Sequence, residues 1–368
     1  MKKIKPLTQA LLLCLAPFGS ALAQDATAQT PTPTTVDAAQ RKAVVQSIAT
    51  QLQANYVFPE IAQRLSVQLK AREASGAYAS ATHAEAFSNL LSKDLRELGK
   101  DGHFAVGFDP QFKSNPPASI PGAEQQQQMR TFMSSMGFGF ERVERLPGNV
   151  GYLELRGFGP AEIVAEAMSA AVTLLSGTDA MIIDLRRNGG GEPSGVAQLL
   201  SHFFPSGDQR HLNDIYTRPL DTTQQYWTNP TVATRYAKPV YVLTSKRTFS
   251  GGEECAYDFQ TQKRGTIVGE STGGGSNPGD NFALAKGFVM FIPTGKSINP
   301  VTKTNWEHVG VKPDIAVPAA QAQQTAYVTI LRTLVAASKD PDQTAELQEA
   351  LAMAEKGESP KPNYAPPR

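Results

Sequence analysis

Apolar residues recur at helical spacing in three successive segments near the start of the chain. In each segment the apolar side chains lie three or four positions apart, so they share one face of a helix. The segments are residues 37–56, 57–76 and 82–99. Asp37 is placed to cap the first helix, and Thr82, with Glu85 three residues later, has the spacing of a capping box at the third. The pattern predicts a domain of three helices over residues 37–100.

After residue 100 the apolar pattern becomes that of buried strands alternating with helices. Short, mainly apolar runs such as MIIDL at 181–185 and VYVL at 240–243 are typical of strands covered on both faces. Amphipathic segments separate these runs, and strand, helix and strand at this spacing predict an α/β core with parallel strands. We place this core at residues 101–335. A C-terminal helical segment follows, and residues 336–368 hold its end and a tail that we expect to be disordered.

One polar stretch interrupts the α/β pattern at residues 111–135. It is rich in Pro and Gln, so we expect an irregular surface segment, and whether it forms a lid stays open. Several Phe and Met residues follow in MRTFMSSMGFGF at 129–140. This composition is consistent either with ordinary packing or with the lining of an apolar pocket.

The first 23 residues have the order of a secretory signal. Lysines near the start precede an apolar run, and Ala21-Leu22-Ala23 supplies the small residues expected before a cleavage site. We therefore expect cleavage near Ala23/Gln24 and a periplasmic or secreted protein. The apolar run is too short for a stable membrane anchor. The Thr- and Pro-rich residues 24–36 predict a flexible lead-in.

The composition argues against some classes of partner and of chemistry. The chain has 35 basic and 34 acidic residues, a balance that argues against a nucleic-acid partner. After cleavage only Cys255 remains, so an internal disulfide is excluded, and we expect this cysteine to pack against the sheet. The histidines and cysteines lack the spacing of zinc ligands, and the sequence implies no metal and no other cofactor. The oligomeric state stays open.

Two glycine-containing turns follow buried strands and are candidates for chemistry. In open α/β sheets the reactive crevice lies beyond the carboxyl ends of the strands. Ser250 stands at such a strand-to-helix corner before Gly251, and Gly189 and Gly190 follow the strand MIIDL. Backbone N–H groups at these turns can stabilise a developing oxyanion, so the pair of turns suits acyl transfer from a serine nucleophile. By itself, a serine at this position is more often a helix N-cap.

The segments around these turns resemble a known protein family. TSKRTFSGGEECAYDFQTQKRGTIVGESTGGGS at 244–276 resembles the nucleophile segment of the tail-specific, or C-terminal processing, protease superfamily, and IIDLRRNGGG at 182–191 is similar to its oxyanion strand. QANYVFPEIAQRL, LRELGKDGHFAVGF and TNWEHVGVKPDIAV resemble the branch with interphotoreceptor retinoid-binding protein-like members. The resemblance covers nearly all of residues 40–335. It implies a serine peptidase acting on peptides or proteins, with an α/β fold that has a crotonase-like or ClpP-like ββα core.

Departures from the superfamily pattern select among its mechanisms. The bacterial processing proteases pair their serine with a lysine, and the matching position here is Gly275, so a Ser/Lys mechanism is not implied. The tricorn-like branch uses a histidine, which can activate a serine hydroxyl at neutral pH, and a late glutamate. A serine precedes that histidine in tricorn-type members, and Gly102 stands there in this chain. The site implied by the resemblance is Ser250 as nucleophile, His103 as general base, Glu307 as orienting or polarising group, and the backbone of Gly251 with Gly189 or Gly190 as oxyanion hole.

Other functions stay open on the same scaffold. Modules of the retinoid-binding branch carry apolar ligands such as retinoids or fatty acids without a nucleophile, and an inactive scaffold that binds peptides by strand addition is a third possibility. Retention of Ser250, His103 and Glu307 together favours hydrolysis, because a carrier has no use for that trio. A PDZ domain needs roughly 80–90 residues. The polar gap before GNVGYLELRGF spans only residues 111–147, so we expect no PDZ domain.

Overall fold

The computed structural model describes residues 34–114 and 122–358. The expected signal sequence at 1–23, most of the lead-in and the end of the C-terminal tail lie outside these ranges. The chain forms two compact units: the first comprises residues up to 126 with 214–224 and 277–298, and the second comprises 127–213, 225–276 and the residues from 299 onward. In the part of the chain that the structure describes, no helix is long and apolar enough to cross a membrane.

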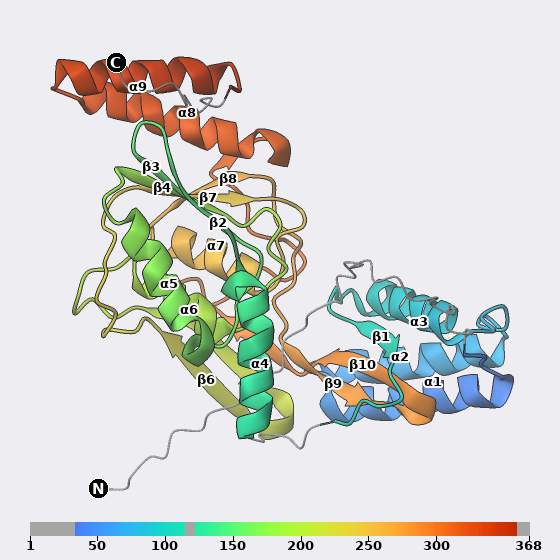
Figure 1. The fold of residues 1–368 in the computed structure, drawn as a ribbon. Helices are drawn as coiled ribbons and strands as arrows, with labels where there is room; N and C mark the ends of the chain where they lie inside the picture. The colour runs from blue at the N-terminus through green and yellow to red at the C-terminus, as the bar shows by residue number, and fades with distance from the viewer. Residues whose placement is uncertain (1–33, 115–121, 359–368) are drawn as a thin grey trace, which may run out of the picture. The chain divides into compact units, whose positions relative to one another are not determined.

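The first unit combines three helices with a small antiparallel sheet (Figure 1). Its helices are α1 (Ala38–Asn55), α2 (Pro59–Ala74) and α3 (Ala84–Gly99). Its strands pair in the order β1 (Ala105–Phe108), β10 (Phe288–Pro293) and β9 (Gly279–Ala283), and the short helix η3 (Ala285–Gly287) lies between the last two. Helices and strands share one buried apolar core that includes Ile48, Leu52, Phe87, Leu91, Phe104, Phe288 and Met290. The core of the helices is therefore completed by strands from much later in the chain.

A further small sheet has three strands, in the order β11 (Gly295–Ile298), β5 (His211–Thr217) and β6 (Thr222–Trp227). Strand β11 pairs antiparallel with residues 214–217 of β5. The short helix η2 (Arg218–Leu220) lies between β5 and β6.

Local capping explains where the first helices begin, with one departure from the sequence pattern. Asp37 caps α1 as expected, because its carboxylate accepts the N–H of Gln40 at 2.7 Å. The predicted capping box that starts at Thr82 is wrong, because His83 is the N-cap residue of α3 and makes no side-chain cap bond. The Thr82 carbonyl instead accepts the Val36 N–H at 2.8 Å, which ties the segment before α1 to this turn.

The second unit is built on a six-stranded sheet. Its strands lie in the order β12 (Ile315–Ala316), β8 (Thr266–Gly269), β7 (Val240–Thr244), β4 (Ala180–Asp184), β3 (Val150–Leu155) and β2 (Phe140–Leu146). Neighbouring strands are parallel except for β2 and β3, which are antiparallel. Every residue of β3 and β4 is buried, as expected for strands covered on both faces. The predicted α/β core with parallel strands is confirmed.

Helices cover both faces of this sheet (Figure 1). On one face lie α5 (Ala161–Leu175), α6 (Pro193–Ser201) and α7 (Gly251–Thr261), and on the other lie α8 (Ala319–Ala337) and α9 (Pro341–Glu355). The face under α8 and α9 has its own apolar core, which includes Tyr152, Ile182, Leu243, Val268, Ala326, Leu331 and Leu347. The carboxyl ends of β4 and β7 therefore emerge between two helical layers, which is where the sequence places its candidate chemistry.

A helix stands where we expected an irregular polar segment. Helix α4 (Ala123–Ser135) covers the second half of that segment, and the short helix η1 (Gly137–Gly139) follows it. The residues of α4 are mostly Ala, Glu, Gln and Met, which favour the helix intrinsically although their apolar periodicity is weak. Of its side chains only Met133 is buried, and it packs beside Gly159.

Candidate active site

Ser250 stands at a sharp corner between β7 and α7. Strand β7 ends at Thr244, and Ser250 is the N-cap residue of α7. Its backbone angles are φ 52° and ψ −123°, a region that residues other than glycine rarely occupy. An ordinary N-cap has extended backbone, so capping does not require this conformation. Strained backbone at a strand-to-helix turn is instead typical of an exposed serine nucleophile.

The glycine turn after β4 packs directly against this corner. A Cβ atom built on Gly190 would lie 2.7 Å from the Cβ of Ser250 and 2.9 Å from the N of Gly251. A Cβ built on Gly252 would lie 2.6 Å from Oδ1 of Asn188. Glycine at 190 and 252 is what allows the two turns to approach so closely. The structure thus brings together the two glycine turns that the sequence singled out.

The backbone N–H groups of these turns differ in their availability. Gly190 donates to Oδ1 of Asn188 at 2.8 Å, and Gly189 donates to the carbonyl of Arg156 at 3.2 Å. Among residues 34–114 and 122–358, the N–H groups of Gly191 and Gly251 have no hydrogen-bond acceptor. A Cβ built on Gly251 would lie 3.1 Å from the N of Gly191, so the two donors are close neighbours. Sequence reasoning missed Gly191, although the third glycine of NGGG was a visible signal.

Glu253 holds the turn that carries Ser250 by hydrogen bonds. Its buried carboxylate accepts the Ser250 N–H at 2.9 Å, the Thr272 hydroxyl at 2.5 Å, the Gly274 N–H at 2.6 Å and the Gly275 N–H at 2.8 Å. Burial raises the pKa of Glu253, although these donors favour its ionised form. Gly275, which stands where the lysine of a Ser/Lys pair would be, is thus a backbone ligand of this carboxylate.

Glu307 belongs to a turn that is hydrogen-bonded to the loop at residues 274–276. Its carboxylate accepts the Ser276 N–H at 2.5 Å and the Ser276 hydroxyl at 3.1 Å, and its side chain is only 10% exposed. The Trp306 indole N–H donates to the Gly275 carbonyl at 2.8 Å, and the His308 N–H donates to the Gly274 carbonyl at 2.9 Å. The loop that Glu253 holds against Ser250 therefore also positions Glu307.

The neighbouring histidine lies close to Glu307. In an alternating strand, Glu307 and His308 would point to opposite faces. Residues 307–309 form a turn instead, and Nδ1 of His308 lies 3.6 Å from Oε1 of Glu307. His308 has a positive φ of 64°, so strand alternation does not apply to it.

His103 lies in the first unit, just before β1, and is oriented by a carboxylate. Its Nδ1 is 3.2 Å from Oδ1 of Asp101, and its backbone N–H donates to the same oxygen at 3.0 Å. The other oxygen of Asp101 accepts from the Tyr56 hydroxyl at 3.3 Å and from the Asn277 amide at 3.0 Å. Burial alone would raise the pKa of Asp101, but the hydrogen bonds from His103 and Asn277 outweigh it and the pKa is lowered.

This pairing can orient the ring of His103, a role for which the sequence had offered Glu307. An ionised carboxylate accepts from Nδ1–H of a histidine, which leaves the lone pair of the ring on Nε2. The His103 side chain is only 6% exposed, so its ring is held rather than mobile. Asp101 was missed by sequence reasoning, and the signal was its position two residues before the histidine in DGHF.

Comparison with known proteins places the chain in a family. Residues 149–317 match the model of peptidase family S41, and residues 35–136 match that of the N-terminal domain of peptidase S41 in eukaryotic IRBP. The chain belongs to peptidase family S41. The resemblance that the motifs carried is thus confirmed, and so is its IRBP-like branch at the N-terminal domain.

Individual relatives of this S41 chain agree with that assignment. It is 28% identical over 192 residues to carboxyl-terminal-processing peptidase 2, chloroplastic, of Arabidopsis thaliana, a match of 48% of this chain and 35% of that protein. It is 27% identical over 182 residues to carboxy-terminal processing protease CtpB of Bacillus subtilis, covering 48% of this chain and 36% of that protein. The match thus spans little more than a third of the length of either relative.

A solved structure shares the fold of the S41 chain. The crystal structure of mature CPAF superposes with a TM-score of 0.53 at 13% identity and covers 86% of this chain and 97% of that one. The predicted α/β fold with N-terminal helices and a C-terminal helical segment is confirmed.

Two buried acids lie one helical turn apart on α7, which begins directly after Ser250. Glu254 and Asp258 on α7 are both almost fully buried. Burial raises the pKa of Glu254 to about 8, and burial together with the charge of Glu254 raises the pKa of Asp258. Amide groups of Asn213 and Asn299 contact this pair, and Cys255 between them is fully buried with a raised thiol pKa. The prediction that Cys255 is packed is confirmed.

The stability of this S41 chain is expected to fall as the pH rises from 4.5 to 8. Folded protein keeps a proton on Glu254 that the unfolded chain releases near pH 4.5, so this contribution is complete below 4.5 and is lost up to about pH 8. The slope is at most about 1.4 kcal/mol per pH unit for one group. The Glu254→Gln variant should weaken this dependence and leave the part that the raised pKa of Asp258 contributes, as measured by thermal unfolding between pH 5 and 9. The matched Glu166→Gln change, at an exposed position of α5, should leave it intact, and identical profiles for the two variants would contradict the assignment.

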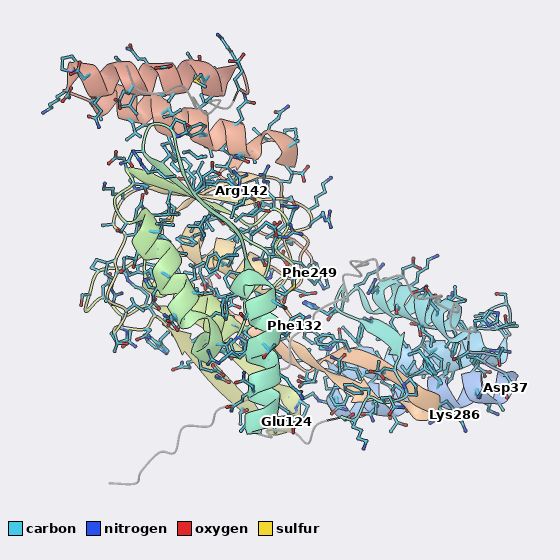
Figure 2. The ribbon with its side chains drawn as sticks, viewed as in Figure 1. Asp37, Glu124, Phe132, Arg142, Phe249 and Lys286 are labelled. Atoms are coloured by element: carbon cyan, nitrogen blue, oxygen red, sulfur yellow. The ribbon has the colours of Figure 1, made fainter. Side chains whose placement is uncertain are left out.

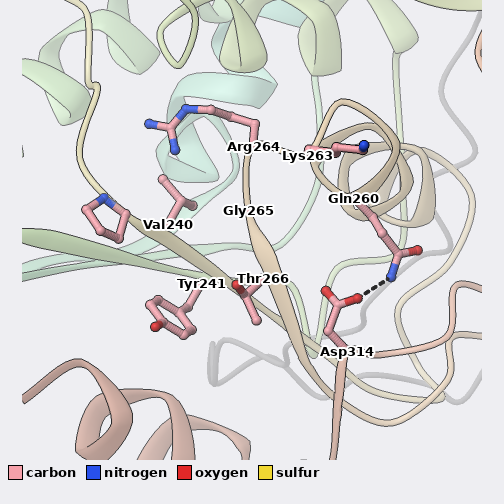
Figure 3. Close-up of a pocket in the computed structure, with 9 residues that line it drawn as sticks. Val240, Tyr241, Gln260, Lys263, Arg264, Gly265, Thr266 and Asp314 are labelled. Carbon is pink, nitrogen blue, oxygen red and sulfur yellow. Dashed lines mark hydrogen bonds between the residues drawn. The ribbon is translucent and has the colours of Figure 1, made fainter. Parts of the chain in front are cut away.

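A cavity of about 380 Å³ lies at the opposite ends of the strands (Figure 3). Its lining includes Val240 and Thr266 at the starts of β7 and β8, and Gln260, whose amide donates to Asp314 at 3.0 Å. The guanidinium of Arg264, also in the lining, donates to the backbone carbonyls of Phe203, Tyr236 and Lys238. This guanidinium therefore helps to hold the fold, and the cavity lies away from the carboxyl edge where Ser250 stands.

Proposed function

We propose that this S41 chain is an exported serine peptidase that cleaves peptides or proteins through an acyl-enzyme at Ser250. The observation that carries the proposal is the corner itself: Ser250 has φ 52°, and beside it lie the N–H groups of Gly251 and Gly191, which have no acceptor within the described part of the chain. Such donors can bind the oxygen of a tetrahedral intermediate once its charge develops. A helix cap has no need of either feature.

His103 acts as general base in the proposed mechanism. Ser250 Oγ attacks the acyl carbon while its proton passes to Nε2 of His103, and His103 then gives that proton to the leaving amine. A water molecule then attacks the ester carbon and gives a proton to His103. His103 passes that proton to Ser250 Oγ as the carboxylic acid leaves. Support for this role comes from the Asp101 contact, which sets the tautomer of His103. Asp101 is a positioning residue.

The remaining predicted residues take supporting roles. Glu307, held by Ser276, orients or polarises groups near the serine. Gly251 with Gly191 supplies the oxyanion donors, because Gly189 and Gly190 would first have to leave their acceptors at Arg156 and Asn188. Export to the periplasm or the medium rests on the signal pattern of residues 1–23.

Covalent labelling tests the proposal directly. The intact protein is expected to react with a fluorophosphonate, and mass spectrometry should place the adduct on Ser250. The Ser250→Ala variant should not be labelled, whereas Ser75→Ala, at an exposed serine after α2, should be labelled like the wild-type protein. Failure of the wild-type protein to be labelled, together with no cleavage of unfolded polypeptides, would contradict the proposal.

The carrier of retinoids or fatty acids stays a prediction. Of the Phe and Met residues that could line its pocket, Met133 is buried beside Gly159, and Phe132 and Met136 are 42% and 52% exposed. Solvent extraction of the same purified protein for bound lipid separates the two functions, because only the carrier requires a stoichiometric apolar ligand.

A further inference from the structure

Exposed apolar side chains gather at one end of α4. Phe132 lies in its last turn and Met136 directly follows its end, and they are 42% and 52% exposed. The Met136 N–H donates to the Phe132 carbonyl at 3.2 Å, so the helical geometry continues to Met136. The first turns of the helix carry Glu124 and a run of glutamines instead. Figure 2 shows Glu124 at one end of α4 and Phe132 toward the other. The helix is thus polar where it begins and apolar where it ends.

The segment after α4 adds a third aromatic residue in an unfavourable backbone conformation. Phe138 has φ 54° and ψ 28° between Gly137 and Gly139, which also have positive φ. A bulky residue in this left-handed region is an outlier that persists only where the surroundings impose it. The half-buried Phe138 therefore holds a fixed place next to the exposed end of α4.

A short series of backbone contacts connects this apolar end with the nucleophile. A Cβ built on Gly139 would lie 2.3 Å from the Gly157 carbonyl oxygen, so η1 lies against the segment after β3. The N–H of Phe158 in that segment donates to the Gly190 carbonyl at 2.9 Å. Gly190 in turn contacts Ser250. Phe138, which directly precedes Gly139, is thus linked through Gly157, Phe158 and Gly190 to the corner that carries Ser250.

We propose that Phe132, Met136 and Phe138 form an apolar platform that binds a large apolar side chain of an extended polypeptide substrate. The bound side chain lies a few residues from the bond that Ser250 cleaves. This inference rests on the proposed peptidase function and adds its substrate class, unfolded segments with Leu, Phe or similar residues near the cleavage point. The flexible Met136 lets the platform accept apolar side chains of different shape. Continuity with the glycine turn at Ser250 favours substrate over an unrelated partner.

A positional peptide library tests the platform. Quenched fluorogenic peptides carry either leucine or serine at one position at a time, and rates are divided by the concentration of Ser250 that a fluorophosphonate labels. The wild-type protein should prefer leucine at one or more positions. The preference is the ratio of kcat/KM for the leucine peptide to kcat/KM for the serine peptide. In the double variant Phe132→Ser, Met136→Ser this ratio should fall about tenfold, the size expected for removing an apolar contact. The control Leu174→Ser, at a 71% exposed residue of α5, should keep it.

The outcomes separate the platform from the peptidase. Cleavage with an unchanged leucine preference in the double variant overturns the platform and leaves the peptidase standing. A wild-type protein that is neither labelled nor active overturns the peptidase and the platform with it. A fatty acid that binds the wild-type protein stoichiometrically and no longer binds the double variant assigns these residues to a carrier and also overturns the platform.

Discussion

The Asp101→Asn variant is expected to hydrolyse peptides with a kcat about 10⁴-fold below that of the wild-type protein. Oδ1 of Asp101 lies 3.2 Å from Nδ1 of His103 and accepts its backbone N–H at 3.0 Å. An asparagine can offer its NH₂ group to Nδ1, which stabilises the tautomer with the proton on Nε2. That imidazole cannot accept a proton from Ser250. The fall should be seen equally in kcat and in kcat/KM, because the lost interaction belongs to the transition state.

A matched change separates this role from support of the fold. Tyr56→Phe removes a donor 3.3 Å from the other oxygen of Asp101 and leaves the contact with His103 in place. We expect it to lower kcat by less than about tenfold, since one long hydrogen bond contributes little. Steady-state kinetics and thermal unfolding of both variants provide the measurement. A kcat of Asp101→Asn within tenfold of the wild-type value, with a lowered melting temperature, would show that Asp101 only stabilises the domain.

The sequence predicted best what depends on short stretches of chain. Strand β4 is buried throughout and β7 almost so, and their apolar runs MIIDL and VYVL could therefore be recognised from four or five residues. Ser250 could be placed at a corner because a strand, a serine and two glycines follow each other directly. Helix α1 and its Asp37 cap are equally local.

The parts that the sequence did not predict depend on contacts between distant residues or on backbone angles. Strands β9 and β10 share the core of α1–α3, although they lie about 180 residues after the end of α3, and local periodicity cannot predict such a distant contact. The failure of the Thr82 capping box has the same origin, because residues 34–36 bind that turn. In the folded turn, Gly189 and Gly190 donate to Arg156 and Asn188, whereas the Gly191 N–H has no acceptor among the described residues. The order of the residues alone does not show this difference.

Gly190 and Gly189, in the turn after β4, differ in how much space surrounds them. Gly190 has φ 108° and faces Ser250, whereas no atom lies within 4 Å of a Cβ built on Gly189. A methyl group at 190 would meet backbone atoms of Gly251 and Phe249 at 2.9 and 3.0 Å, in addition to the Cβ of Ser250. These atoms belong to the turn of Ser250 itself, whose N–H is bonded to the Glu253 carboxylate. The overlap therefore cannot be relieved by rotating a flexible side chain.

Gly190→Ala is accordingly expected to lower the free energy of unfolding by about 2–4 kcal/mol, through the positive φ and the overlap together. The folded fraction of Gly190→Ala should react with a fluorophosphonate about 100-fold more slowly than the wild-type protein, because a displacement of Ser250 by about 1 Å has an effect of that size. Gly189→Ala, one residue away, should change the free energy of unfolding by no more than about 0.5 kcal/mol. Urea unfolding of both variants and the labelling rate of Gly190→Ala measure these effects. Equal stability of the two variants would mean that the glycine turn does not press against Ser250, and the geometry assigned to the nucleophile would have to be abandoned.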